Sequence, residues 1–235
     1  MATTTPLPEV RIYRDEDYFF FEGGGWELYD QLDAWAGERA GVRITYTDGD
    51  VVVRRISRRH HWFTKRIDNL VWALAHAAGI PCEDAGATTF REKASNAGAQ
   101  ADQTYYFGPH AVQMLGPKNV EPGVDPVPDL AIEVQVGDPV TLALQAWARL
   151  GVPEVWHLDA SRDELRLRML RLPADGTPYA PAVGSGFLPA TETEILELLM
   201  SSLNEGSQAW QALLAGRVAQ VLDARGRTGS DEGQA

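Results

Sequence analysis

The chain has 235 residues, a formal net charge of -12 at pH 7 and 44% apolar residues, so we expect a moderately sized globular domain with a real core. The acidic balance argues against a protein that grips duplex DNA over a wide basic surface, although a local basic patch can override the mean charge. The single cysteine, Cys82, excludes a disulfide within the chain, and no Cys and His pair has zinc-ligand spacing. We interpret Cys82 as a buried structural residue rather than a nucleophile.

The N-terminal sequence MATTTPLPEVRIYRDEDYFFF has no cationic leader followed by an apolar run. Its apolar run over residues 18–21 is too short to be a signal or a membrane span. We therefore expect a cytoplasmic protein with no membrane association, and the reduced state of a lone cysteine fits that compartment.

Periodicity and turn residues divide the first eighty residues into a loose polar lead-in, a helix, a hairpin and a second helix. These occupy residues 1–17, 26–36, 43–48 with 50–56, and 60–78, respectively. The Asp48-Gly49 pair supplies the positive-φ turn of the hairpin, and Gly37 and Gly79 end the two helices. The long helix carries its apolar residues on one face: Phe63, Ile67, Leu70, Val71, Leu74 and Ala78.

The rest of the chain alternates strands and helices around one long surface loop. We predict strands over 88–91, 102–107, 130–136, 152–159 and 164–172, helices over 138–150, 191–203 and 206–222, and the loop over 108–128. Asp138 is the expected N-cap of its helix, with Pro139 at the first position and Gly151 beyond the end.

The strand over residues 130–136 has one apolar face and one polar face, because side chains alternate along a strand. The apolar face carries Leu130, Ile132, Val134 and Val136, and the opposite face carries Asp129, Glu133 and Gln135. In one interpretation the polar face is exposed at a sheet edge. In the other, Glu133 is partly buried and needs a cation, a metal ion or hydrogen bonds. The pattern leaves both interpretations open.

A second carboxylate, Asp102, opens a strand of its own. If this strand pairs with that of Glu133, two carboxylates meet and form an oxygen site suited to a hard cation such as Mg²⁺. Such an ion activates water and stabilises charge on a phosphate during hydrolysis.

A basic run, RRISRRHH over residues 54–61, is followed by Lys65 and Arg66 and stands out in this acidic chain. It reaches the start of the long helix, where backbone N–H groups also favour anions. We interpret Arg58, Arg59, His60 and Lys65 as candidate nucleic-acid phosphate contacts. The alternative is a solvated face paired with the many carboxylates. His76 and His157 lie in apolar contexts and are interpreted as structural.

The region from Gly41 to Trp156, and less sharply on to Leu222, resembles the Uma-two (Uma2) family of restriction endonuclease-like proteins, which have the PD-(D/E)XK nuclease fold. The matching segments occur in family order: GVRITYTDGDV, Ser57-x-x-His60, GATTFRE, ADQTYYFG, PDLAIEV and ALQAWARLGVPEVWHLD. The resemblance implies a mixed α+β, restriction endonuclease-like fold, with a central mixed sheet flanked by helices, an N-terminal hairpin and C-terminal helices. The implied organisation is a lead-in and helix over 1–40, the nuclease-fold core over 41–190, packed helices over 191–224 and a disordered tail over 225–235.

The resemblance also implies the site. Asp102 and Glu133 match the family's metal-binding acidic residues, and Gln135 falls where the fold commonly has its catalytic lysine. We therefore expect Asp102, Glu133 and Gln135 as catalytic residues, Mg²⁺ or Mn²⁺ as cofactor, DNA as partner, and a homodimer by family analogy.

The sequence departs from the family pattern at several positions. Where members carry the lysine on the next helix, four residues before an aromatic residue (here Trp147), this chain has Ala143. Ala101 replaces the usual proline before Asp102, and Thr45 replaces a hairpin glutamate. Glutamine cannot supply a positive charge or deprotonate water. The expected functions are thus a metal-dependent endonuclease of weakened activity, a nuclease-fold protein that binds without cutting, or a hydrolase of another phosphate ester.

Overall fold

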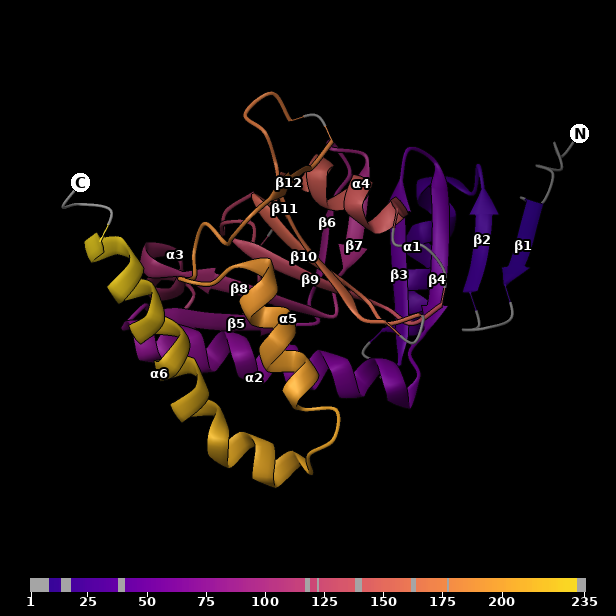
Figure 1. The fold of residues 1–235 in the computed structure, drawn as a ribbon. Coiled ribbons are helices and arrows are strands. Elements are labelled where there is room, and N and C mark those ends of the chain that lie inside the picture. The colour runs from indigo at the N-terminus through magenta and orange to yellow at the C-terminus, as the bar shows by residue number, and fades with distance from the viewer. Residues whose placement is uncertain are drawn as a thin grey trace, which may run out of the picture.

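The computed structural model describes residues 9–13, 18–37, 41–116, 119–121, 123–137, 141–161, 164–176 and 178–231. Within these ranges the chain forms two six-stranded sheets and six helices, a mixed α/β fold consistent with the restriction endonuclease-like architecture (Figure 1). None of the described helices is long and apolar enough to cross a membrane.

The first sheet is antiparallel and has the strand order β1-β2-β4-β3-β7-β6. Its strands are β1 (Glu9–Tyr13), β2 (Tyr18–Glu22), β3 (Val42–Thr47), β4 (Asp50–Arg55), β6 (Thr89–Glu92) and β7 (Ala97–Gln100). Helix α1 (Gly25–Ala36) packs on β3 and β4. The β3–β4 hairpin turns through Asp48 and Gly49, both at positive φ, as predicted.

The second sheet is mixed and has the order β12-β11-β10-β9-β8-β5. Its strands are β5 (Cys82–Gly86), β8 (Gln103–Phe107), β9 (Leu130–Gln135), β10 (Glu154–Asp159), β11 (Arg166–Arg171) and β12 (Ala180–Ala182). Strands β9 and β10 are parallel and are joined through helix α4 (Thr141–Leu150), as a parallel pair requires. All other pairs are antiparallel, including β8 with β9.

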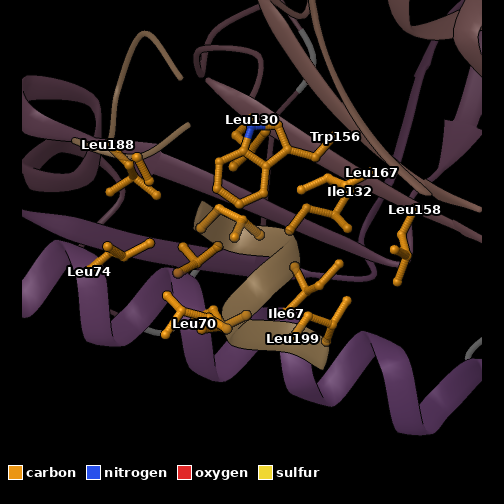
Figure 2. Close-up of a cluster of buried hydrophobic side chains, with 14 of the residues drawn as sticks. Ile67, Leu70, Leu74, Leu130, Ile132, Trp156, Leu158, Leu167, Leu188 and Leu199 are labelled. Atoms are coloured by element: carbon orange, nitrogen blue, oxygen red, sulfur yellow. The ribbon is translucent and has the colours of Figure 1, made fainter. Parts of the chain in front are cut away.

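One face of the second sheet packs on three helices and forms the largest core. The helices are α2 (Arg58–Ala78), α5 (Glu192–Ser201) and α6 (Ser207–Asp231). Figure 2 shows Leu130, Ile132 and Trp156 of the sheet facing Ile67 and Leu70 of α2. This arrangement confirms the apolar face predicted for β9, and all three β-strand side chains are fully buried.

The opposite face of the same sheet is covered by α4, which also contacts β3 and β7 of the first sheet. Small residues make this close packing possible: Ala97, Ala99 and Ala143 are all buried here. Gly98 is required because a Cβ at this position would collide with the ring of Tyr29. The polar face of β9 therefore lies inside the molecule, between the two sheets.

Most predicted elements are confirmed, but several expectations are wrong. Residues within the expected lead-in form β1, because Val10 and Ile12 belong to a strand that pairs with the aromatic strand β2. The expected loop over 108–128 opens with a helix, α3 (Gly108–Gln113), which has proline in its first turn. Between the predicted strands over 88–91 and 102–107, where no strand was predicted, residues 97–100 form β7.

The C-terminal helix also ends later than predicted. Helix α6 runs to Asp231 and so includes the first seven residues of the tail expected to be disordered. No proline follows Leu222, so nothing blocks continuation of the backbone hydrogen bonds. At the end of α2, Ala78 is exposed although it was predicted on the buried face. The predicted cap residues Asp138 and Pro139 lie outside the described residues.

Replacing Leu70 with alanine should lower the free energy of unfolding by about 2–5 kcal/mol, because it leaves a cavity between α2 and the second sheet. The matched control is Leu213→Ala on α6, where the side chain is 52% exposed and the loss should stay within about 0.5 kcal/mol. Urea unfolding followed by tryptophan fluorescence measures both. Equal losses at the two positions would contradict this description of the core.

Candidate active site

Asp102 and Glu133 meet between the two sheets. The Asp102 N–H donates to the Ile132 carbonyl at 3.1 Å, and the adjacent β8–β9 pairing fixes this register. The Asp102 Oδ2 accepts from the backbone N–H of Val134 at 2.7 Å. Both carboxylates are buried, with Asp102 3% and Glu133 1% exposed. The predicted convergence of the two acidic residues is therefore present, and the exposed-edge interpretation of Glu133 is wrong.

A cation from the first sheet lies between the two carboxylates. The Arg54 Nη2 is 3.3 Å from both Asp102 Oδ1 and Glu133 Oε2. Its Nη1 donates to the carbonyl oxygen of Val134 at 3.3 Å. Arg43, directly opposite Arg54 on β3, places its Nε 3.9 Å from Asp102 Oδ1. Arg54 thus forms ion pairs with both carboxylates, and these pairs join the two sheets.

The first turn of α2 supplies a third neighbour. The Ser57 side chain caps the helix by accepting from the His60 N–H at 3.1 Å. This cap holds His60 at the helix start, and its Nε2 lies 2.9 Å from Asp102 Oδ2. The His60 ring is buried, and its Nδ1 has no hydrogen-bond partner among the described residues. The Ser-x-x-His segment therefore serves to bring an imidazole to Asp102.

The environments of the two carboxyl groups push their pKa values apart. Burial, followed by the neighbouring Asp102 charge, raises the pKa of Glu133 to about 7. Burial would also raise the pKa of Asp102, but Arg54, His60 and the Val134 N–H together hold it below its ordinary value. The Trp147 indole N–H donates to Glu133 Oε1 at 2.8 Å and favours the ionised form of Glu133. Asp102 is therefore the permanent anion of the pair.

Gln135 is two residues beyond Glu133 on β9, but its amide group is already engaged. Its Nε2 donates to the Gly137 carbonyl at 3.1 Å, and its Oε1 is 2.9 Å from His157 Nε2. The guanidinium of Arg168 lies 3.0 Å from His157 Nδ1, and since arginine only donates, that nitrogen must accept. His157 is therefore neutral and donates from Nε2 to Gln135. His157 is 2% exposed, in keeping with its structural interpretation.

The four residues predicted to contact phosphate do not face one place. His60 is at the carboxylates, whereas Arg58 and Lys65 line a groove of about 520 Å³ between α2 and α6. Lys65 is paired there with Asp68 at 3.0 Å. Arg59 Nη2 donates to the Ala160 carbonyl at 3.1 Å, beyond the end of β10. The first turn of α2 thus divides between the buried site and the surface.

Comparison of the sequence with models of known protein families identifies the family of this chain. The Uma2 family model, described as "putative restriction endonuclease", matches residues 26–204. The chain belongs to the Uma2 family. A search of curated proteins found no match. At the family level the buried carboxylates therefore belong to a nuclease-type fold, and the match covers every residue of the site from Arg43 to Arg168.

The donor atoms of this Uma2 site fit a hard divalent cation. Among the described residues, no three His, Cys, Asp or Glu side chains are grouped so that they could hold a metal ion. Mg²⁺, however, commonly uses only one or two carboxylates together with water and substrate oxygens. Asp102, Glu133 and the Val134 carbonyl present three oxygens to a single cation, the Arg54 guanidinium, which stands in for such an ion.

Sequence reasoning missed three contributors: Arg43, Arg54 and Trp147. Strand alternation accounts for the direction of the two arginines. Val51 and Val53 of β4 pack on the face of the first sheet that α1 covers, so Arg54 points to the opposite face. Arg43 is directly opposite Arg54 on β3 and points the same way. Trp147 lies one turn after Ala143 on α4, so it was visible as the family's aromatic position but not as a hydrogen-bond donor. Ala143 itself is buried in the packing of α4.

His157 should make the protein sensitive to acid. Burial, followed by the charge of Arg168, lowers the pKa of His157 from its ordinary value to about 4. Between about pH 6.5 and 4 the unfolded chain binds this proton and the folded chain does not, so stability falls as the pH falls. A pKa difference of this size corresponds to about 3 kcal/mol at most.

The His157→Gln variant, which keeps a donor and an acceptor, should lose less stability than the wild type between pH 7 and pH 4.5. Urea unfolding at both pH values measures the difference, and His61→Gln at an exposed position of α2 controls for the loss of a histidine. An unchanged pH dependence in His157→Gln would show that His157 does not carry the effect.

Proposed function

We propose that this chain is a DNA endonuclease that depends on Mg²⁺ or Mn²⁺ and hydrolyses phosphodiester bonds. The observation that supports it is the convergence of Asp102, Glu133 and the Val134 carbonyl on one cation position between the sheets. In this proposal Asp102 and Glu133 are the metal-binding residues. When bound, a divalent ion polarises the phosphate and lowers the pKa of water.

The remaining residues have positioning roles in this proposal. The Trp147 indole fixes Glu133 Oε1, and the Val134 N–H together with His60 fixes Asp102 Oδ2. Gln135 orients the attacking water through the free lone pair of Oε1, because its other contacts are to His157 and Gly137. Gln135 carries no charge, so it stabilises the transition state less than lysine would, and we expect slow cleavage.

DNA binding in this proposal is weak and salt-dependent. Arg58, Arg59 and Lys65 contact phosphates away from the scissile bond. Their side chains leave the first turns of α2 in other directions than His60, which points to the carboxylates. The net charge of -12 limits the non-specific affinity that phosphate contacts can give. A homodimer, in which each subunit cuts one strand, completes the proposal.

The second candidate is a nuclease-fold protein that binds DNA without cutting it. Three observations favour it: Arg54 occupies the cation position, the Gln135 amide is engaged by His157, and Ala143 stands where a lysine would be needed. An uncharged residue at both lysine positions removes the charge that would assist the attack on phosphorus. The two candidates differ in whether plasmid is nicked.

Incubating supercoiled plasmid with the full-length protein and Mg²⁺ or Mn²⁺ should give nicked product, and chelation of the ion should abolish it. Asp102→Asn and Glu133→Gln should each lower the rate by on the order of 100-fold or more, because each removes a negative ligand. These variants keep the size of the side chain, and circular dichroism checks their fold. Glu27→Gln, at an exposed position of α1, is the matched control.

A gel-shift with the same DNA separates the candidates. DNA binding without nicking across both ions would support the binding protein and contradict the endonuclease. Nicking that survives unchanged in Asp102→Asn and Glu133→Gln would instead point to a contaminating nuclease and count against the proposed site.

A further inference from the structure

Arg54 contacts all three protein oxygens that the proposed ion would bind. Its Nη2 is 3.3 Å from Asp102 Oδ1 and 3.3 Å from Glu133 Oε2, and its Nη1 is 3.3 Å from the Val134 carbonyl oxygen. A divalent ion bound to those oxygens at about 2.1 Å would lie where the guanidinium now lies. The two cations therefore cannot occupy the position together.

The charges around the site also indicate that Arg54 and a divalent ion cannot both be bound there. Arg43 and Arg54 are directly opposite each other on β3 and β4, an arrangement of like charges that is unfavourable without counter-charges. Asp102 supplies one negative charge and Glu133 supplies a second when it is ionised, and together they then balance the two arginines. A divalent ion added to this buried cluster would leave an excess of two positive charges. Burying uncompensated charge is costly, so one cation has to leave.

Arg54 is the cation that is able to leave. It is the penultimate residue of β4, and its side chain is 12% exposed, so solvent reaches part of it. Its contacts with the two carboxylates, at 3.3 Å, are longer than the 2.7–2.9 Å typical of strong charge-assisted hydrogen bonds. Trp147 and the Val134 N–H hold the same carboxylates at 2.8 and 2.7 Å. The carboxylates are thus fixed by neutral donors that would stay in place when Arg54 withdraws.

We propose that Arg54 is a built-in competitor of the divalent ion, so that metal binding is an exchange in which the guanidinium leaves the three oxygens. This inference rests on the proposed metal site but concerns affinity rather than cleavage. In the absence of the ion, Arg54 stabilises the fold by pairing with Asp102 and Glu133. In its presence, Arg54 weakens ion binding by the free energy needed to displace it.

Calorimetric titration of the full-length protein with Mn²⁺ tests the exchange. Arg54→Gln, which removes the competing charge, should bind Mn²⁺ at least about tenfold more tightly than the wild type. Arg55→Gln is the matched control, since it removes the same charge from the next residue of β4, which is exposed. Its Mn²⁺ affinity should stay within about twofold of the wild type. Arg54→Lys keeps the charge and should retain most of the competition.

Thermal unfolding supplies a readout that does not depend on activity. Without divalent ions, Arg54→Gln should melt below the wild type, because the two buried carboxylates then lose the one cation that pairs with both. Mn²⁺ should raise the melting temperature of Arg54→Gln more than that of the wild type, since a tighter ligand stabilises more at equal concentration. Asp102→Asn introduced into Arg54→Gln should remove this gain.

The outcomes separate this inference from the proposed function. Metal-dependent nicking by the wild type, together with Mn²⁺ affinity in Arg54→Gln equal to or weaker than wild type, would overturn the exchange and leave the endonuclease intact. Tighter Mn²⁺ binding by Arg54→Gln without any nicking would support the exchange and contradict the endonuclease. Failure of Arg54→Gln to bind Mn²⁺ at Asp102 would contradict both.

Discussion

The ion pairs of Arg54 with Asp102 and Glu133 are the interaction on which the relation between the two sheets depends. Arg54 comes from β4 of the first sheet, whereas Glu133 lies on β9 of the second sheet and Asp102 directly precedes β8 of the same sheet. Carboxylates this deeply buried cost several kcal/mol each unless they are paired and hydrogen-bonded. Arg54, Arg43 and Trp147 satisfy these buried charges beside the packing of α4 against β3 and β7.

Two kinds of groups stabilise the Asp102 and Glu133 pair. Neutral donors, the Val134 N–H and the Trp147 indole, fix the carboxylate oxygens at short distances. Charged groups, Arg54 and Arg43, balance them from a neighbouring sheet. Next to the cluster, Gln135 of β9, His157 of β10 and Arg168 of β11 form a row of hydrogen bonds across three adjacent strands. The paired members of this polar network favour one arrangement of the strands, whereas the His60 Nδ1 has no hydrogen-bond partner among the described residues.

The sequence predicted the carboxylates better than it predicted their partners. Alternation along β9 was enough to place Glu133 opposite the core of Leu130 and Ile132, and the strand beginning at Asp102 was recognisable from its own pattern. Arg54, by contrast, reaches Asp102 and Glu133 across 48 and 79 residues of sequence, and no local pattern specifies such a contact. The basic run was visible, but helical geometry divides its members between the buried site and the surface groove.

Strand β7 was missed for a related reason. Its alanines and glycine have low strand propensity, so no strand was predicted there, yet only small side chains allow α4 and Tyr29 to approach so closely. Tertiary packing overrides local propensity here. The same small residues let α4 pack closely on β7 of the first sheet, and Trp147 of α4 contacts Glu133 of the second sheet.

The indole of Trp147 consequently gives the protein an optical probe at its own centre. It is fully buried and hydrogen-bonded to Glu133, so any change in the charge or ligation of that carboxylate alters the electric field at the ring. Emission from this residue, isolated as the difference between the wild type and Trp147→Phe, would follow events at the carboxylate pair in real time and without a label.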